Sequence, residues 1–133
     1  MTGMDAALTQ MLVGQDVLLV EDETAISFLI EDMLAEMSVG SVRHAARIDK
    51  ALAFITEKLP TLAVLDVNVA GALVFPVAER LAEAKVPFLF MTGYGRSGVG
   101  ERWAAYEVLQ KPFTPAAMQT ALRQLLNATA TTG

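Results

Sequence analysis

The sequence predicts an α/β fold in which a doubly wound, five-stranded parallel sheet carries helices on both faces. Short apolar runs alternate with helical segments along the chain. Runs that are apolar on both faces are typical of parallel strands, because the crossover helices cover both sides of the sheet. A length of 133 residues, 53% of them hydrophobic, fits one domain with a complete core. We therefore expect one globular unit with the strand order 2-1-3-4-5.

The first part of the chain is expected to supply two strand–helix pairs. Residues 17–20 (VLLV) predict a buried strand and residues 23–37 a helix. Six apolar residues of this helix recur at steps of three and four, which predicts one buried face: Ile26, Leu29, Ile30, Met33, Leu34 and Met37. Residues 41–45 (SVRHA) predict a short strand, and residues 48–59 predict a helix that is closed by Pro60.

The middle of the chain repeats this pattern. Residues 61–66 (TLAVLD) predict a third strand, which is apolar until it ends in an acid, and residues 67–74 predict a loop. The next helix is expected to begin near Pro76, because proline suits the first turn of a helix. This helix turns three apolar residues inward: Val77, Ala78 and Leu81.

The last third predicts two more strands and a closing helix. Residues 86–92 (VPFLFMT) and 106–110 (YEVLQ) are the strands. Four glycines fall within residues 93–100, so any helix that follows them should be short. Thr114 suits an N-cap and Pro115 a first helical residue. The helix that they begin is expected to bury Met118, Leu122, Leu125 and Leu126.

Composition and charge exclude several classes of function. With 15 acidic and 10 scattered basic residues, the formal net charge is −5, so we expect no nucleic-acid partner. The chain has no cysteine, which excludes a disulfide framework and a thiolate zinc site. The single histidine, His44, is expected to be an ordinary surface or packed residue. Any metal should therefore be held by oxygen.

The chain shows no secretory signal and no apolar run long enough to cross a bilayer. We therefore expect a cytoplasmic protein without a membrane partner. Residues 1–14 and 128–133 are expected to be short tails on a single domain that covers residues 15–127.

Acidic residues follow two of the predicted strands at the edge where ligands bind. In open α/β sheets that edge is formed by the carboxyl ends of the strands, and in the flavodoxin-like order the site lies between strands 1 and 3. Glu21 and Asp22 end the first strand and Asp66 ends the third. Carboxylates so close together repel one another and need a cation. Oxygen ligands without thiol or imidazole suit Mg²⁺, so we expect these residues to form a magnesium site.

A hydroxyl and an ammonium group join the same edge. Thr92 ends the fourth strand and Lys111 follows the fifth. Both can donate to an anion held over the metal, so the set describes a site that forms and holds an aspartyl phosphate, with Asp66 as the nucleophile. Each residue alone has an ordinary explanation, such as a helix N-cap for Asp22 or a solvated surface lysine for Lys111. Their joint occurrence favours the functional interpretation.

Over residues 15–127 the chain resembles the response-regulator receiver (CheY-like) domain. The resemblance rests on motifs that occur in order at strand ends: Glu21-Asp22, Asp66 in LAVLDVN, Thr92 in FMTG and Lys111 in LQKPF. It implies that Asp66 accepts a phosphoryl group from a histidine kinase or a histidine phosphotransfer protein, with Mg²⁺ as cofactor. It also implies that the backbone carbonyl of Asn68 completes the metal shell and that the peptide bond before Pro112 is cis.

Two positions depart from the family pattern. Ala70 stands where a proline usually follows the phosphoacceptor, which changes the expected geometry of that loop. Val108 holds the position of the aromatic switch residue, so the usual threonine–tyrosine switch cannot work in its ordinary form. Instead, PFLFMTGYG (87–95) is similar to the PFxFATGYG signature of the FATGUY subgroup of single-domain receivers, with Met91 in place of alanine.

The subgroup resemblance implies a switch formed by Thr92 and Tyr94. We expect the glycine loop over residues 93–100 to become ordered when a phosphoryl group on Asp66 draws in Thr92. The resemblance also implies partner kinases of the HWE or HisKA2 type.

The expected function is that of a monomeric, stand-alone receiver, a switch or phosphate sink that acts by protein–protein contact and is not an enzyme. One alternative is a degenerate receiver that serves as a constitutive binding scaffold, which Ala70 and Val108 favour. A small enzyme acting on a phosphorylated metabolite would need a larger pocket than this short chain is expected to provide. Trp103 and Tyr106 have two interpretations of equal weight, a partner-binding surface or the edge of the core.

Overall fold

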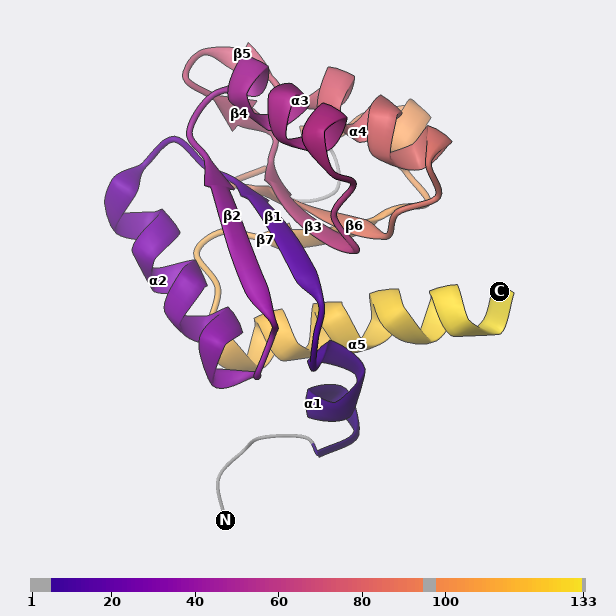
Figure 1. The fold of residues 1–133 in the computed structure, drawn as a ribbon. Coiled ribbons are helices and arrows are strands. Elements are labelled where there is room, and N and C mark those ends of the chain that lie inside the picture. Colours follow the sequence, from indigo (N-terminus) through magenta and orange to yellow (C-terminus); the bar gives the residue numbers. More distant parts are fainter. Residues whose placement is uncertain (1–5, 95–97, 133) are drawn as a thin grey trace.

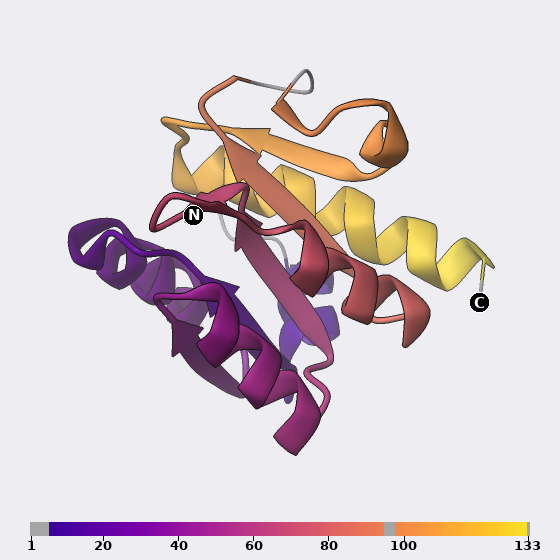
Figure 2. The same cartoon turned by 90° about the horizontal axis from the view of Figure 1, so that it is seen from above.

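The computed structural model describes residues 6–94 and 98–132 and has a five-stranded parallel sheet between two layers of helices (Figure 1). The strand order is β2-β1-β3-β6-β7, which confirms the predicted order 2-1-3-4-5. From above, the strands cross the molecule from purple β2 to orange β7 (Figure 2). Their bounds are Asp16–Val20 (β1), Ser41–Ala45 (β2), Leu62–Asp66 (β3), Phe88–Thr92 (β6) and Glu107–Gln110 (β7).

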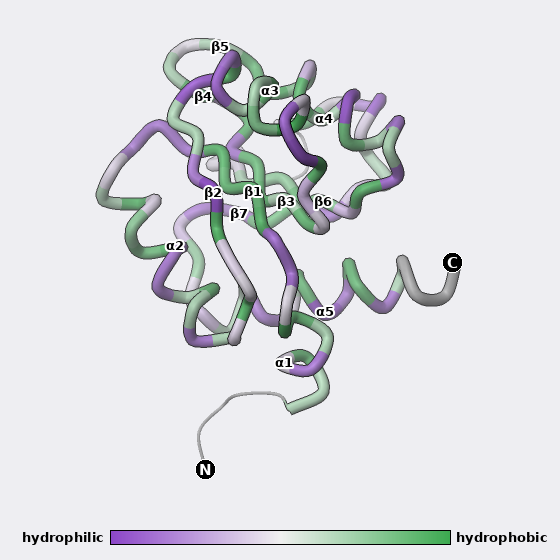
Figure 3. Tube along the Cα trace, in the orientation of Figure 1, coloured by the Kyte–Doolittle hydropathy of each residue, from purple (hydrophilic) through white to green (hydrophobic). Residues whose placement is uncertain are grey.

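Helices cover both faces of the sheet and create two cores, because successive strand residues point to opposite sides. Leu18 and Val20 pack toward α3 (Ile48–Glu57) and α4 (Phe75–Glu83). Val17 and Leu19 pack toward the other layer, which consists of α1 (Ala6–Leu12), α2 (Thr24–Glu36) and α5 (Pro115–Thr132). The hydropathy colouring shows the buried strands as a mainly green centre (Figure 3). Within the described ranges, no helix is long and apolar enough to cross a membrane.

Helices extend into both of the predicted tails. Helix α1 lies within the expected N-terminal tail, and its Leu8 and Leu12 are fully buried in the core beside α5. These two leucines are one helical turn apart, so seven residues suffice to place both on the same buried face. At the other end α5 continues to Thr132. Residues 1–5 and 133 lie outside the described part of the chain.

The predicted loop over 67–74 contains a small antiparallel hairpin, formed by β4 (Asn68–Val69) and β5 (Ala72–Leu73). Its two turn residues both have positive φ, 53° at Ala70 and 83° at Gly71. Two such residues in succession give the turn twist that matches a hairpin. The proline expected at position 70 would have φ near −65° and would not permit this turn. Alanine at this position therefore permits the hairpin, which proline would prevent.

The segment between β6 and β7 agrees with the prediction of a short helix. A 3-10 turn, η2, covers Glu101–Trp103. Gly100 precedes it with a φ of 77°, a conformation that favours glycine. Residues 95–97 of the predicted switch loop lie outside the described part of the chain.

A buried ion pair closes the amino-terminal edge of the sheet. Arg43 Nη2 lies 2.9 Å from Asp16 Oδ2, so β2 is joined to β1. The same guanidinium donates to the carbonyl oxygens of Phe54 and Lys58 at 3.0 and 2.8 Å, which satisfies the end of α3. Asp16 also accepts a hydrogen bond from Ser41 Oγ at 3.1 Å. The hydrogen bonds of the Asp16 carboxylate therefore stabilise the fold.

We predict that Ala70→Asn stabilises the protein by about 1 kcal/mol, because asparagine tolerates the left-handed conformation that costs alanine roughly this much. Urea unfolding of the two proteins measures the difference. Ala72→Asn is the matched control in the adjacent strand, where asparagine is disfavoured and should not stabilise. Equal effects of both substitutions would show that the turn conformation is not the cause.

Candidate functional site

Three carboxylates meet at the carboxyl-terminal edge of the sheet. Strands β1 and β3 are parallel neighbours, with Val20 opposite Leu65, so the residues that follow them emerge side by side. Glu21, Asp22 and Asp66 each offer one carboxylate oxygen, and these oxygens all lie within 4.8 Å of one another. Glu21 is fully buried and Asp66 is 6% exposed, whereas Asp22 is exposed. The structure therefore brings the three predicted acidic residues together.

Lys111 places its ammonium group against two of these carboxylates. Its Nζ lies 3.1 Å from Asp66 Oδ2 and 3.3 Å from Glu21 Oε1. The backbone of Lys111 is held in place, because its N–H donates to the carbonyl of Thr92 at 2.9 Å. The peptide bond to Pro112 is cis, as the family resemblance implies. Lys111 thus supplies a positive charge in the middle of the acidic group.

Burial and neighbouring charges shift the pKa values of two groups in this site. Burial, together with the charge of Asp66, raises the pKa of Glu21 to about 7, even though Lys111 and the N–H of Glu23 act in the opposite direction. Burial acts to lower the pKa of Lys111, but its hydrogen bond to Asp66 and the two negative charges raise that pKa overall. A cation bound beside these carboxylates would favour the ionised form of Glu21.

Thr92 adds a buried hydroxyl to the same edge. The residue ends β6, is 3% exposed and accepts a hydrogen bond from the backbone N–H of Tyr94 at 3.1 Å through its Oγ1. The tyrosine side chain itself is 82% exposed. A hydroxyl that accepts this bond keeps its own proton for donation to an anion.

A pocket of about 460 Å³ connects these groups. Its polar lining includes Asp22, Asp66, Asn68, Thr92 and Lys111, whereas Glu21 lies beneath the surface. Leu73 from the hairpin and Tyr94 also line it. Every predicted site residue thus lies in or directly under one pocket.

The donor set fits a hard divalent cation. It consists of carboxylate oxygens without thiol or imidazole, which is the chemistry that Mg²⁺ selects. Asn68 lies in β4 at the pocket, where its backbone could add a carbonyl ligand. The ordinary explanation of Asp22 as a helix cap is wrong, because the N-cap of α2 is Glu23 and it makes no side-chain cap bond.

The other residues considered from sequence belong to the fold. His44 Nε2 lies 2.7 Å from the carbonyl oxygen of Glu21, so this histidine is packed beneath the site. Trp103 is 2% exposed and contacts Phe90 edge to face at 5.7 Å. Tyr106 stacks on Phe88 at 5.0 Å. These contacts support the interpretation of Trp103 and Tyr106 as core residues.

One surface feature was not predicted. Leu29 was expected on the buried face of α2 but is 54% exposed, and its neighbour Phe28 is 61% exposed. Leu29 borders an apolar groove of about 340 Å³ with Ile26, Ile30, Pro112 and Phe113, and Lys111 lines both this groove and the acidic pocket. The helical periodicity placed Leu29 on the apolar face of α2, but periodicity does not show how much of that face the sheet covers.

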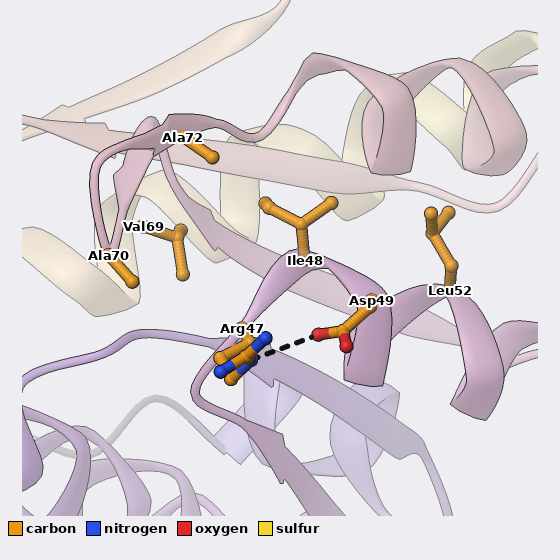
Figure 4. Close-up of a pocket in the computed structure, with 7 residues that line it drawn as sticks. All are labelled: Arg47, Ile48, Asp49, Leu52, Val69, Ala70 and Ala72. Carbon is orange, nitrogen blue, oxygen red and sulfur yellow. Dashed lines mark hydrogen bonds and ion pairs between the residues drawn. The ribbon is translucent and has the colours of Figure 1, made fainter.

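A further pocket, of about 470 Å³, lies between the start of α3 and the β4–β5 hairpin (Figure 4). Ile48, Leu52 and Val69 give it an apolar lining, and the exposed pair Arg47–Asp49, 3.2 Å apart, stands at its side. Its lining holds no group of acids suited to a metal. We assign it no chemistry.

Comparison with known proteins identifies the family of the chain. The family model of the response regulator receiver domain matches residues 17–123. No curated protein sequence matches the chain.

Solved structures extend the comparison. The BeF3-activated conformation of SdrG from Pseudomonas melonis Fr1 is 37% identical, with a TM-score of 0.73 over 92% of this chain and 99% of that one. The receiver domain of PhyR from Erythrobacter litoralis is 26% identical, with a TM-score of 0.72 over 88% and 93%. For a full PhyR stress response regulator the identity is 28% and the TM-score 0.70 over 90% of this chain, which spans 48% of that protein.

We predict that the stability of the metal-free protein falls as the pH rises from about 4.5 to about 7, by on the order of 3 kcal/mol. In this window the folded protein retains a proton on Glu21 that the unfolded chain releases, so a higher pH favours unfolding. Urea unfolding in the presence of a chelator, at several pH values, measures the effect.

Glu21→Gln should remove most of this pH dependence, and Glu23→Gln, a change at a neighbouring exposed acid, should leave it in place. An unaltered pH profile in Glu21→Gln would contradict the assignment to Glu21.

Proposed function

We propose, from the premise that this chain belongs to the response regulator receiver domain family, that it accepts a phosphoryl group on Asp66 with Mg²⁺ as cofactor. The observation that carries the proposal is the position of Asp66: its carboxylate is nearly buried, opens into the pocket, lies within 4.8 Å of two other acids and contacts Lys111 at 3.1 Å. Receiver domains generally bind Mg²⁺ at such an acidic pocket and interact with histidine kinases or phosphotransfer proteins.

In the proposed reaction an oxygen of Asp66 attacks the phosphorus of a phosphohistidine. The new O–P bond forms as the P–N bond breaks, and the electron pair returns to the imidazole, which takes up a proton. Bound Mg²⁺, held by Glu21, Asp22, Asp66 and the Asn68 carbonyl, would neutralise charge on the phosphoryl oxygens. Lys111 Nζ and the Thr92 hydroxyl would donate to the same oxygens.

We further propose that the chain is a switch of the FATGUY type. Its support is the PFLFMTGYG sequence, the buried Thr92 beside the exposed Tyr94, and a small residue, Val108, at the usual aromatic position. In this proposal Thr92 and Tyr94 respond to phosphorylation and partner proteins read the result. The protein would act as a monomeric switch or phosphate sink and not as an enzyme. Its expected cytoplasmic location stays a prediction.

We propose that the phosphoryl donor docks on the apolar groove beside the site. Phe28 and Leu29 offer exposed apolar surface on α2, and Lys111 lines both the groove and the acidic pocket. A helical partner packed on the groove would hold its phosphohistidine over Asp66. A donor kinase of the HWE or HisKA2 type is the proposed partner.

We predict that incubation with acetyl phosphate and Mg²⁺ adds one phosphoryl group, detected by intact mass. The addition should disappear without metal and in Asp66→Asn, because each removes part of the reacting site. Circular dichroism of Asp66→Asn controls for folding. Absence of any addition, also with a panel of kinases, would favour the constitutive scaffold.

We also predict that Leu29→Gln slows transfer from a phosphorylated histidine kinase by roughly ten-fold, as expected for the loss of one well-placed apolar contact. Its reaction with acetyl phosphate should not change, because this small donor needs no docking surface. Leu59→Gln is the matched control. Leu59 is similarly exposed, at 49%, but it precedes β3 and so lies near the amino-terminal ends of the strands, away from the site. An equal loss in both variants would contradict docking at the groove.

A further inference from the structure

Gly98 lies directly against the side chain of Thr92. A Cβ atom built on Gly98 would lie 2.5 Å from Thr92 Oγ1 and 3.3 Å from both Thr92 Cβ and Cγ2. The first distance is far inside van der Waals contact, so no residue with a side chain fits here unless Thr92 or the backbone moves.

Space, and not backbone conformation, requires glycine at this position. The φ of Gly98 lies outside the left-handed range, so other residues could adopt its backbone conformation. Gly100 shows the opposite case: its φ is 77°, but an added Cβ would meet nothing within 4 Å. The two glycines therefore allow the two effects to be separated by experiment.

The segment after Gly98 is anchored in the core, so it cannot easily move away from Thr92. Val99 is 4% exposed and Trp103 is 2% exposed. Trp103 is stacked on Phe75, with ring centroids 6.0 Å apart, and contacts Phe90 edge to face. A methyl group at position 98 would therefore act mainly on the Thr92 side chain, which can rotate about χ1.

We propose that Gly98 is a positioning residue for Thr92. Because Gly98 has no side chain, the Thr92 hydroxyl can lie where it does in the pocket that contains Asp66 and Lys111. Gly98 itself lines that pocket, together with Asp66 and Lys111. The backbone at residue 98 holds the hydroxyl from one side and the N–H of Tyr94 holds it from another, at 3.1 Å. The inference rests on the proposed function, because it assigns Gly98 to the same reaction.

The test is a double-mutant cycle with Gly98→Ala, Thr92→Ala and the double variant. The measured quantity is the rate of phosphoryl addition from acetyl phosphate with Mg²⁺, followed by intact mass. Gly98→Ala should slow the reaction by roughly ten-fold or more, the range for one lost hydrogen bond to a charged group. In the Thr92→Ala background it should have little further effect, because Oγ1, the atom that the new methyl group would meet at 2.5 Å, is gone. Losses that multiply, or a Gly98→Ala variant that reacts like the native protein, would overturn the proposal.

Gly100→Ala is the control for strain in the same segment. It should lower the melting temperature by a few degrees, because alanine is placed at positive φ, yet leave the phosphorylation rate within two-fold of the native value. A loss of rate equal to that of Gly98→Ala would overturn the proposal, since Gly100 does not contact Thr92.

A readout without any phosphoryl donor separates this proposal from the proposed function. NMR coupling constants that report χ1 of Thr92 should show a changed rotamer in Gly98→Ala and the native rotamer in Gly100→Ala, even if the native protein accepts no phosphoryl group. An unchanged rotamer in Gly98→Ala would overturn the inference. If Gly98→Ala does not fold, recovery of folding in the double variant with Thr92→Ala supports the contact, and failure to recover contradicts it.

Discussion

Mutual repulsion of three carboxylates at one edge of the sheet is the constraint on which the rest of the site depends. The parallel pairing of β1 and β3 makes Glu21, Asp22 and Asp66 neighbours, and nothing in the local sequence can move them apart. Lys111 contacts two of them, and burial is the main cause of the raised pKa of Glu21, to which the charge of Asp66 adds. A site that holds three carboxylates beside one ammonium group is suited to bind a cation.

The opposite edge of the sheet shows how a carboxylate is treated when it serves only the fold. Asp16 accepts hydrogen bonds from Arg43 and Ser41, and Arg43 also satisfies the end of α3. Because Arg43 donates to both carboxylate oxygens of Asp16, this carboxylate is not available to bind a ligand. Lys111 offers a point charge on a flexible stem, so in the proposed reaction it would leave Asp66 for a phosphoryl oxygen without breaking the backbone contact that positions it.

Sequence alone predicted the parts of the structure that follow from period and strand order. Asp66, Thr92 and Lys111 end or follow strands, so the order of the sheet determines where they lie. It did not predict α1, the exposure of Leu29 or the contact of Gly98 with Thr92. Helix α1 and Leu29 depend on packing between elements that are remote in the chain, and the contact of Gly98 with the nearby Thr92 depends on the path of the backbone between them. Residue periodicity carries no information about either.

The aromatic core explains why a switch at Thr92 is physically more reasonable than a ring movement in this chain. Trp103 is buried against Phe75 and Phe90, and removing a ring of this size from a core costs about 3–5 kcal/mol. The coupling energy that a ligand usually transmits between sites is about 1–3 kcal/mol. In the proposed switch, phosphorylation would rotate the Thr92 hydroxyl and leave Trp103 in the core. With Val108 at the usual ring position, the change that a partner would detect would arise where Thr92 meets Tyr94 and Gly98.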